Sequence, residues 1–316
     1  MRIKIIKNRS DIGAGTRGSD MGIDAIEIAA INQGNDFFNR FPFIDVDTHN
    51  ESVYNKVKNS FAKRIQYVLE QCIRVCNSVK NEIQNGFFPI VFSGDHSSAL
   101  GTISGIKAAY PDKKLGVVWI DAHADLHSPY SSPSGNVHGM PLAAAIQEDN
   151  KKFDVNQTSN ETASCWEKMK RIGIEKQKVM PKDIIYFGVR DTEKPEDHLI
   201  EKFEIKNYKV HEIRHRGMKE CLDEVIETLD RCDIIYISFD VDSMDCDLIS
   251  KGTGTPVSRG FDQYEVIEII KRLFETNKVC CWEICEVNPL LDNKGNKMAE
   301  TAFEVIDTIV KELKNK

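Results

Sequence analysis

Six runs of mostly apolar residues recur along the chain, each of a length typical of a β-strand. They are Ile3–Ile6, Phe87–Phe92, Leu115–Ile120, Ile184–Val189, Ile234–Phe239 and Val279–Val287. Between most of them lie segments whose apolar residues repeat every three or four positions, the spacing of an amphipathic helix. These are Val53–Ile83, Ser97–Ala109, Met140–Ile146, Met218–Leu229, Tyr264–Phe274 and Met298–Leu313. The alternation predicts a three-layer α/β/α fold in which helices cover both faces of a mainly parallel sheet.

The pattern favours a single domain over residues 1–316. No internal repeat, low-complexity tract or proline-rich linker divides the chain. The polar segment Glu148–Thr162 is expected to be a surface insertion. In folds of this class ligands bind beyond the carboxyl ends of the strands, so the residues that follow each strand are the candidates for function.

Composition narrows the class of protein. With 42 Lys and Arg against 49 Asp and Glu, the net charge is −7, which argues against a nucleic-acid binder because such proteins need a basic face. No segment resembles a signal peptide or reaches the roughly 18 apolar residues of a membrane span. Nine cysteines, none in a Cys-x-x-Cys pair, fit reduced thiols in a cytoplasmic protein.

Five of the predicted strands end in acids, histidines or both. The motifs are FSGDHS (92–97), DAHADLH (121–127), RDTEKPE (190–196), SFDVDSMD (238–245) and EVNP (286–289). In DAHADLH four ionisable side chains occupy alternate positions, which point to one side of an extended backbone. A solvated loop could carry one such motif without a ligand. Their recurrence at one edge of a parallel sheet favours a metal site, because crowded charges need compensation.

The number of candidate ligands indicates the kind of metal. Four carboxylates and two imidazoles are available: His96, Asp121, His123, Asp125, Asp240 and Asp242. Six ligands are too many for one zinc ion, which usually takes three or four. Six such ligands suit two divalent ions that prefer oxygen ligands, and manganese fits best. A pair of these ions can hold a bridging hydroxide, because it lowers the pKa of the bound water far below that of bulk water. No cysteine belongs to this set, which argues against zinc, copper and iron–sulfur chemistry.

These motifs resemble a known family. GDHS, DAHADLH, SGNVHGMP, SFDVDSMD with GTGTP, and EVNP follow the order and spacing of the ureohydrolases, which include arginase, agmatinase and formimidoylglutamase. The resemblance covers about residues 10–310. It implies one α/β domain around an eight-stranded parallel sheet, two Mn²⁺ ions, hydrolysis of a guanidinium or amidine C–N bond, and assembly into homo-trimers or homo-hexamers.

The resemblance also assigns roles near the metals. One ion would be held by His96, Asp121, Asp125 and Asp240. The other would be held by Asp121, His123, Asp240 and Asp242, with Asp125 also orienting the bridging hydroxide. His138 matches the histidine that passes protons to the leaving amine, and Glu286 matches the carboxylate that hydrogen-bonds the guanidinium. From the residues alone, His138 could equally be a structural histidine and Glu286 part of a buried ion pair.

The loop SGNVHG resembles that of arginases, whereas agmatinases and formimidoylglutamases typically carry a GTPF-like stretch there. By this resemblance Ser134 and Asn136 would contact the substrate α-carboxylate, and Thr255 would line the site. In RDTEKPE, Asp191 and Glu196 match the arginase pattern.

Two further positions depart from it. His127 replaces an asparagine that reaches the α-carboxylate, and Glu193 replaces an aspartate that holds the α-amino group through water. A protonated His127 could attract the carboxylate, or His127 could lie outside the contact shell.

The resulting hypothesis is an enzyme that converts L-arginine to urea and L-ornithine. A sister activity on formimidoylglutamate or another guanidino acid is the main alternative. A metal-free binding subunit and a single-zinc deacetylase of related fold are disfavoured by the intact set of six ligands.

Overall fold

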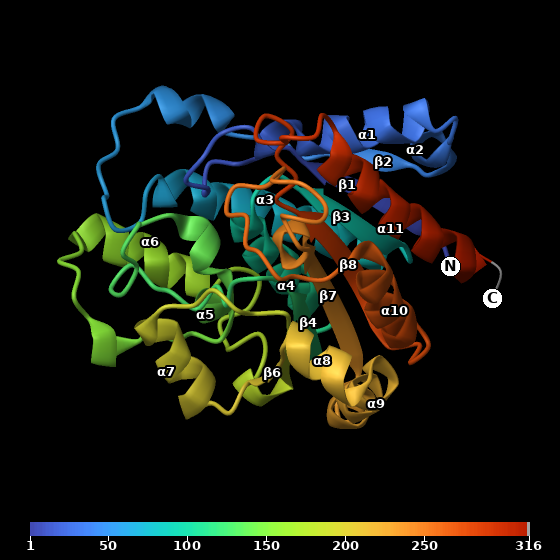
Figure 1. The fold of residues 1–316 in the computed structure, drawn as a ribbon. Coiled ribbons are helices and arrows are strands. Elements are labelled where there is room, and N and C mark those ends of the chain that lie inside the picture. The colour runs from blue at the N-terminus through green and yellow to red at the C-terminus, as the bar shows by residue number, and fades with distance from the viewer. Residues whose placement is uncertain (315–316) are drawn as a thin grey trace.

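Eight strands form one sheet in the computed structural model, which describes residues 1–314 (Figure 1). Their order across the sheet is β2-β1-β3-β8-β7-β4-β5-β6, and every neighbouring pair is parallel. The strands are β1 Ile3–Asn8, β2 Phe43–Asp45, β3 Phe88–Ser93, β4 Leu115–Ile120, β5 Ile184–Phe187, β6 Lys206–Tyr208, β7 Ile234–Asp240 and β8 Val279–Cys285. The expected α/β fold is confirmed.

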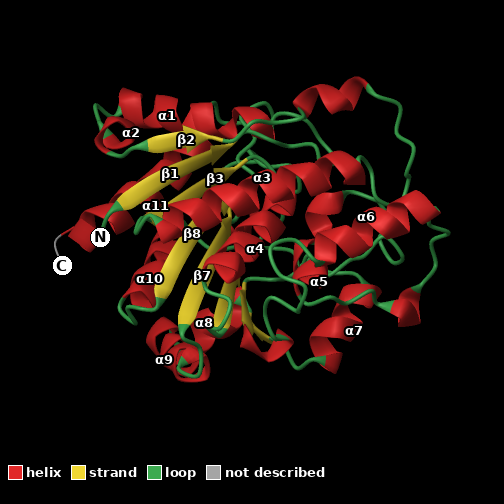
Figure 2. Ribbon diagram, turned by 180° about the vertical axis from the view of Figure 1, so that it is seen from behind, coloured by secondary structure: helices red, strands yellow, loops and turns green. Residues whose placement is uncertain are grey.

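Helices cover both faces of the sheet, because successive side chains of each strand point to opposite sides. On β4, Val118 and Ile120 pack into one core, and Val117 and Trp119 pack into the other. The first layer contains α1 Gly22–Asn32, α2 Phe37–Arg40, α8 Val210–Arg216, α9 Met218–Leu229, α10 Gln263–Phe274 and α11 Lys297–Lys314. The second contains α3 Ile65–Gln84, α4 Ala99–Ala109, α5 Pro141–Ala145, α6 Asn160–Lys170 and α7 Lys194–Lys202. Figure 2 shows the strands between these layers.

All six predicted strands are present, within one or two residues at either end. The two strands that were not predicted, β2 and β6, lie at the two edges of the sheet and have three residues each. Each pairs with a single neighbour, and neither is continuously apolar: Phe43 and Asp45 of β2 are exposed. Their strand conformation is therefore set by pairing and not by a sequence pattern.

The expected helix Val53–Ile83 is wrong in its first third. Asn50–Tyr54 forms a 3₁₀ turn, and α3 begins only at Ile65, after Arg64 in the left-handed conformation (φ 57°). Five helices were not predicted at all: α1, α2, α6, α7 and α8. Of these, α6 begins at Asn160 inside the expected insertion, where Ser159 caps it by accepting a hydrogen bond from the Thr162 amide.

The path of the chain opens a crevice at the carboxyl edge. After β3 the chain passes through α4 to β4, which does not neighbour β3. The intervening places are filled later by β7 and β8. The carboxyl ends of these four central strands lie where the strand order reverses, the usual position of a ligand site in such sheets. No helix within residues 1–314 is long and apolar enough to cross a membrane.

Candidate active site

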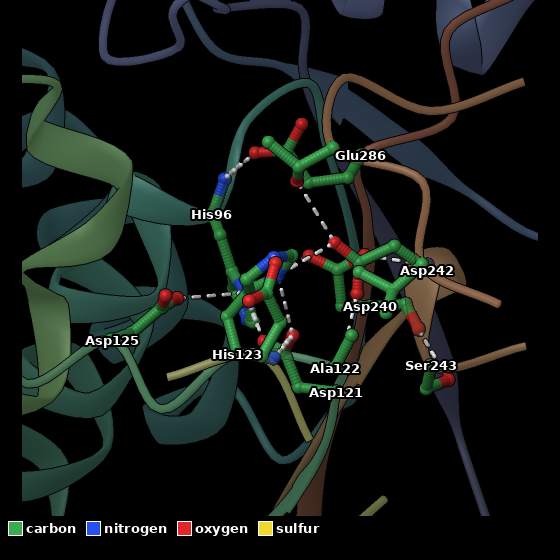
Figure 3. Close-up of polar contacts among 12 residues, drawn as sticks. His96, Asp121, Ala122, His123, Asp125, Asp240, Asp242, Ser243 and Glu286 are labelled. Carbon is green, nitrogen blue, oxygen red and sulfur yellow. Dashed lines mark hydrogen bonds and ion pairs between the residues drawn. The ribbon is translucent and has the colours of Figure 1, made fainter. Parts of the chain in front are cut away.

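The four central strands deliver the predicted ligands to one point (Figure 3). His96 lies three residues beyond β3, and Asp121, His123 and Asp125 follow β4 directly. Asp240 ends β7. Asp242 belongs to the short turn after β7, and Glu286 follows β8. The four strands are almost entirely buried, so these side chains are presented from a rigid base.

One half of the cluster is centred on His96. Its Nδ1 atom lies 3.0 Å from Asp121 Oδ2, 3.1 Å from Asp125 Oδ2 and 3.1 Å from Asp240 Oδ2. Ligands about 2.1 Å from a six-coordinate ion and at right angles lie roughly 3 Å apart. The three distances from His96 Nδ1 agree with that spacing.

The other half is centred on His123. Its Nδ1 atom lies 3.0 Å from Asp242 Oδ2 and 3.4 Å from Asp121 Oδ1. Asp121 therefore offers one oxygen to each half, as a bridging carboxylate would. The triads His96–Asp121–Asp125 and Asp121–His123–Asp242 each have ligand atoms close enough to hold a metal ion.

The chemistry of the donor set fits a pair of hard divalent ions. His96 Nδ1 and Asp121 Oδ2 are buried and lie 3.0 Å apart, but neither forms a hydrogen bond of proper geometry. Burial, followed by repulsion from Asp242 and Asp121, raises the pKa of Asp240 well above its usual range. Burial and the charge of Asp121 raise the pKa of Asp125 to about 6. Such crowding is costly for the bare chain, and bound cations would relieve it.

One expectation about this cluster is wrong. A cysteine does lie beside it: Cys285 Sγ is 3.8 Å from Asp240 Oδ2 and groups with His96 and Asp240 as a candidate ligand. Cys285 is the last residue of β8, so only the pairing of β7 with β8 brings it next to Asp240. Cys285 does not line the cavity. The candidate ligands therefore remain mostly carboxylates.

Two neighbours fix the orientation of the His96 ring. Its Nε2 atom lies 2.7 Å from Ser238 Oγ, and the ring stacks on Trp119 at 4.1 Å with an interplanar angle of 9°. Contacts of this kind set the orientation of a metal-ligating imidazole. They leave Nδ1 directed at the carboxylates.

Two residues of the site adopt the left-handed conformation, Asp125 with φ 52° and Glu286 with φ 65°. Residues other than glycine seldom do so, and such positions cluster at functional sites. Hydrogen bonds hold both: the Leu142 amide donates to Asp125 O, and the Glu286 amide donates to Gly94 O. The strained backbone turns both side chains toward the cavity that they line.

His138 and Glu286 form a pair at the same edge. His138 Nδ1 lies 3.0 Å from Glu286 Oε1, which also accepts a hydrogen bond from the His96 amide. Burial alone would lower the pKa of His138, but the hydrogen bond and charge of Glu286 raise it to about 9. Glu286 Oε2 is buried and has no partner. The ion pair considered as an alternative therefore exists, yet it leaves one oxygen of Glu286 available.

Asp95 supports this pair and was not singled out from the sequence. The His138 amide donates to Gly13 O, and the Gly13 amide donates to Asp95 Oδ2 at 2.8 Å. Asp95 is fully buried. The sequence feature that could have identified Asp95 is its position in the motif GDHS, one residue before His96.

A cavity of about 270 Å³ opens above the cluster. All but one of the predicted site residues line it: His96, His123, Asp125, His127, Ser134, Asn136, His138, Asp191, Glu193, Glu196, Asp240, Asp242, Thr255 and Glu286. The exception, Asp121, is fully buried beneath His96 and His123. Pro133 and Gly139 complete the lining.

The two residues that depart from the arginase pattern contact each other. His127 Nε2 lies 2.5 Å from Glu193 Oε2 and 3.5 Å from Glu196 Oε2. Burial lowers the pKa of His127, while the charge and hydrogen bond of Glu193 act in the opposite direction. Burial and the charge of Asp125 raise the pKa of Glu196 to about 8. The ring of His127 therefore faces two carboxylates, and its predicted role toward a substrate carboxylate stays a prediction.

The remaining predicted contacts lie around the cluster. Thr255 Oγ1 donates to Asp242 Oδ2 at 3.1 Å, and Asp191 Oδ2 lies 3.7 Å from His123 Nε2. The backbone amide of Asn136 donates to Ser134 Oγ, a hydrogen bond within the loop whose residues Ser134 and Asn136 line the cavity.

Comparison with known proteins agrees with this architecture. The Arginase family profile matches residues 2–311. An arginase of Bacillus subtilis is 31% identical over 98% of this chain and 97% of its own length. The structure of Bacillus caldovelox arginase superposes with a TM-score of 0.83 at 31% identity and covers 97% of each chain. That of Entamoeba histolytica arginase in complex with L-ornithine gives 0.82 at 25% identity and covers 98% of each chain.

The whole-chain similarity shows a ureohydrolase, a hydrolase that acts on C–N bonds. Within that class, the chain belongs to the Arginase family.

Proposed function

We propose that the protein hydrolyses L-arginine to urea and L-ornithine with two manganese ions. The observation that carries the proposal is Glu286 Oε2, a buried carboxylate oxygen without a partner that belongs to a cavity-lining residue beside the cluster. A guanidinium group supplies the planar, charged donors that such an oxygen lacks. The relatives named arginase, one of them with L-ornithine bound, support arginine as the guanidino compound.

The proposed metal allocation rests on the resemblance to ureohydrolases, and the two halves of the cluster agree with it except that Asp240 groups only with the His96 half. His96 and Asp125 would serve one ion, His123 and Asp242 the other, and Asp121 and Asp240 both. When bound, a pair of divalent ions supplies a water-derived nucleophile at neutral pH and charge stabilisation in the transition state.

Three side chains of the protein would position the substrate, orient the nucleophile and deliver a proton. Glu286 Oε2 accepts hydrogen bonds from the guanidinium and fixes the position of its central carbon. Asp125 orients the nucleophile, since its carboxylate lies at the cluster and lines the cavity. His138 carries a proton at neutral pH because Glu286 raises its pKa, so it can deliver that proton to the departing amine.

The far end of the cavity receives the amino-acid part of the substrate. Ser134 and Asn136 would hydrogen-bond the α-carboxylate, and Asp191, Glu193 and Glu196 would face the α-ammonium. Thr255 shapes the wall through its bond to Asp242. His127, which also lines the cavity, would hold Glu193 in place.

Product analysis tests the proposal. The manganese-loaded protein is incubated separately with L-arginine, agmatine and formimidoylglutamate, and urea and formamide are quantified. Urea from L-arginine, with little from agmatine, is the expected result. Formamide from formimidoylglutamate and no urea from L-arginine would replace the arginase assignment by the sister activity.

We also propose a trimer or hexamer in the cytoplasm. Assembly rests on the resemblance to arginases, and a sedimentation mass of one chain at micromolar concentration would contradict it. The cytoplasmic location is supported by the nine cysteines, all free and eight of them buried.

A further inference from the structure

Carboxylates make up much of the cavity wall. Seven acids line it: Asp125, Asp191, Glu193, Glu196, Asp240, Asp242 and Glu286. Within residues 1–314, no lysine or arginine does. Such a wall attracts a guanidinium but repels a carboxylate. A substrate that carries both groups needs a positive charge near its carboxylate end.

Lys63 brings such a charge to the cavity. Its ammonium group donates to Asn136 Oδ1 at 3.1 Å, and Asn136 lines the cavity. Of the lysines and arginines in the described chain, Lys63 is the one whose side chain hydrogen-bonds a lining side chain. No carboxylate forms an ion pair with Lys63 in this part of the chain, so its charge is not neutralised there.

The backbone holds Lys63 in this place. The Lys63 amide donates to Gly135 O at 2.7 Å, which ties it to the loop that carries Ser134 and Asn136. Gly135 has φ +69°, and a Cβ atom there would lie 1.9 Å from Ser60 O. Only glycine allows this close approach, so the loop and the segment before α3 are fitted to each other. Arg64 anchors the same segment by donating from Nε to Ile12 O.

We infer that Lys63 is a specificity-determining residue, whose ammonium group selects guanidino substrates that carry a carboxylate at the end remote from the guanidinium. The inference rests on the proposed function and adds the charge that the neutral donors Ser134 and Asn136 lack. A carboxylate held by Asn136 lies next to the half-buried ammonium, where screening by water is reduced. A substrate without that carboxylate gains nothing from Lys63.

Three variants of the full-length, manganese-loaded protein test this role. Lys63→Met keeps the length of the side chain and removes its charge, and Lys63→Arg keeps the charge. Lys58→Met is the matched control, because Lys58 is exposed and lies five residues earlier in the same segment. We expect Lys63→Met to raise KM for L-arginine about 10-fold with little change in kcat, since the lost contact is remote from the reacting carbon. Agmatine turnover should not change, Lys63→Arg should recover most of the affinity for L-arginine because it keeps the charge, and Lys58→Met should behave as the parent protein.

An unchanged KM for L-arginine in Lys63→Met would overturn the inference, and so would an equal loss on L-arginine and agmatine. Calorimetric binding of L-ornithine and of putrescine, which lacks the carboxylate, separates this question from the proposed function. If the parent protein releases no urea but Lys63→Met weakens only L-ornithine binding, the function fails and the role of Lys63 stands. If L-ornithine binds both proteins equally, or binds neither, the role of Lys63 fails.

Discussion

The floor and the rim of the cavity are built in different ways. The floor consists of the six predicted metal ligands and Glu286, and the rim consists of His127, Ser134, Asn136, Asp191 and Glu193. On the floor, the side chains of Asp240 and Asp242 are 3% and 1% exposed, whereas those of Asp191 and Glu193 on the rim are 66% and 52% exposed. Floor residues follow buried strands, and rim residues belong to loops. A floor residue has several partners that depend on it, while the exposed rim residues can change with small structural consequences; His127 is the exception on the rim, because it is buried.

The two residues that depart from the arginase pattern lie in the part of the cavity that tolerates change more readily. Both His127 and Glu193 lie on the rim, and they compensate each other through their 2.5 Å contact. The floor retains every residue that the ureohydrolase resemblance requires. We therefore expect the floor to determine the chemistry and the rim to adjust the affinity for the substrate.

The largest effect should come from breaking the floor. In Asp240→Ala the carboxylate 3.1 Å from His96 Nδ1 is lost, and with it the proposed bridge between the metal ions. We expect at least one manganese equivalent to be lost on metal analysis and turnover to fall to background. Full metal content with full turnover would show that the ligand assignment is wrong.

Removal of the proposed proton donor, His138, should lower the turnover less than the loss of Asp240. His138→Ala should retain metal and fold but lose roughly 10²–10⁴-fold in kcat, the range for a general acid. Added imidazole should restore part of the rate. If turnover is unaffected, His138 has only a structural role.

The third test concerns the link between His138 and Glu286. The pKa of His138, raised to about 9, means that the imidazole keeps its proton at neutral pH and loses it as the pH rises through that value. The stabilisation that this contact gives the metal-free fold should therefore be complete below the usual histidine pKa of 6.5 and disappear as the pH rises through about 9. Glu286→Gln removes the main cause, so the His138 pKa should fall.

NMR titration of the histidines in the metal-free protein measures this change. His127→Asn provides the control, because His127 is held by other carboxylates and is not in contact with Glu286. A His138 titration that is the same in the parent and in Glu286→Gln would contradict the coupling.

The smallest effect should come from the rim. His127→Asn combined with Glu193→Asp restores the arginase pattern and removes the contact that ties the two side chains together. We expect a lower KM for L-arginine with little change in kcat, because both residues are remote from the reacting carbon. Steady-state kinetics of the double variant and of each single variant measures this, and a changed kcat with constant KM would mean that the rim takes part in the chemistry.

The sequence alone determined the parts of the molecule in which one local pattern suffices. The central strands β4 and β7 were predicted because burial on both faces requires continuously apolar runs, and such runs are visible without any partner. The six ligands were predicted because each directly follows such a strand or lies a few residues beyond it, whereas Glu286 was assigned through the family resemblance. Parallel strands then bring their carboxyl ends to one edge whatever their exact order.

Only the tertiary structure decided the features that depend on two distant segments. The three-residue strands β2 and β6 exist because a neighbouring strand pairs with them. Cys285 reaches Asp240 through the pairing of β7 with β8, and His127 meets Glu193 across the cavity rim. Lys63 carries no pattern of its own, because its position follows from a glycine 72 residues later that lets two loops touch. A contact of this kind leaves no periodic signal in the sequence, since neither partner constrains its own neighbours along the chain.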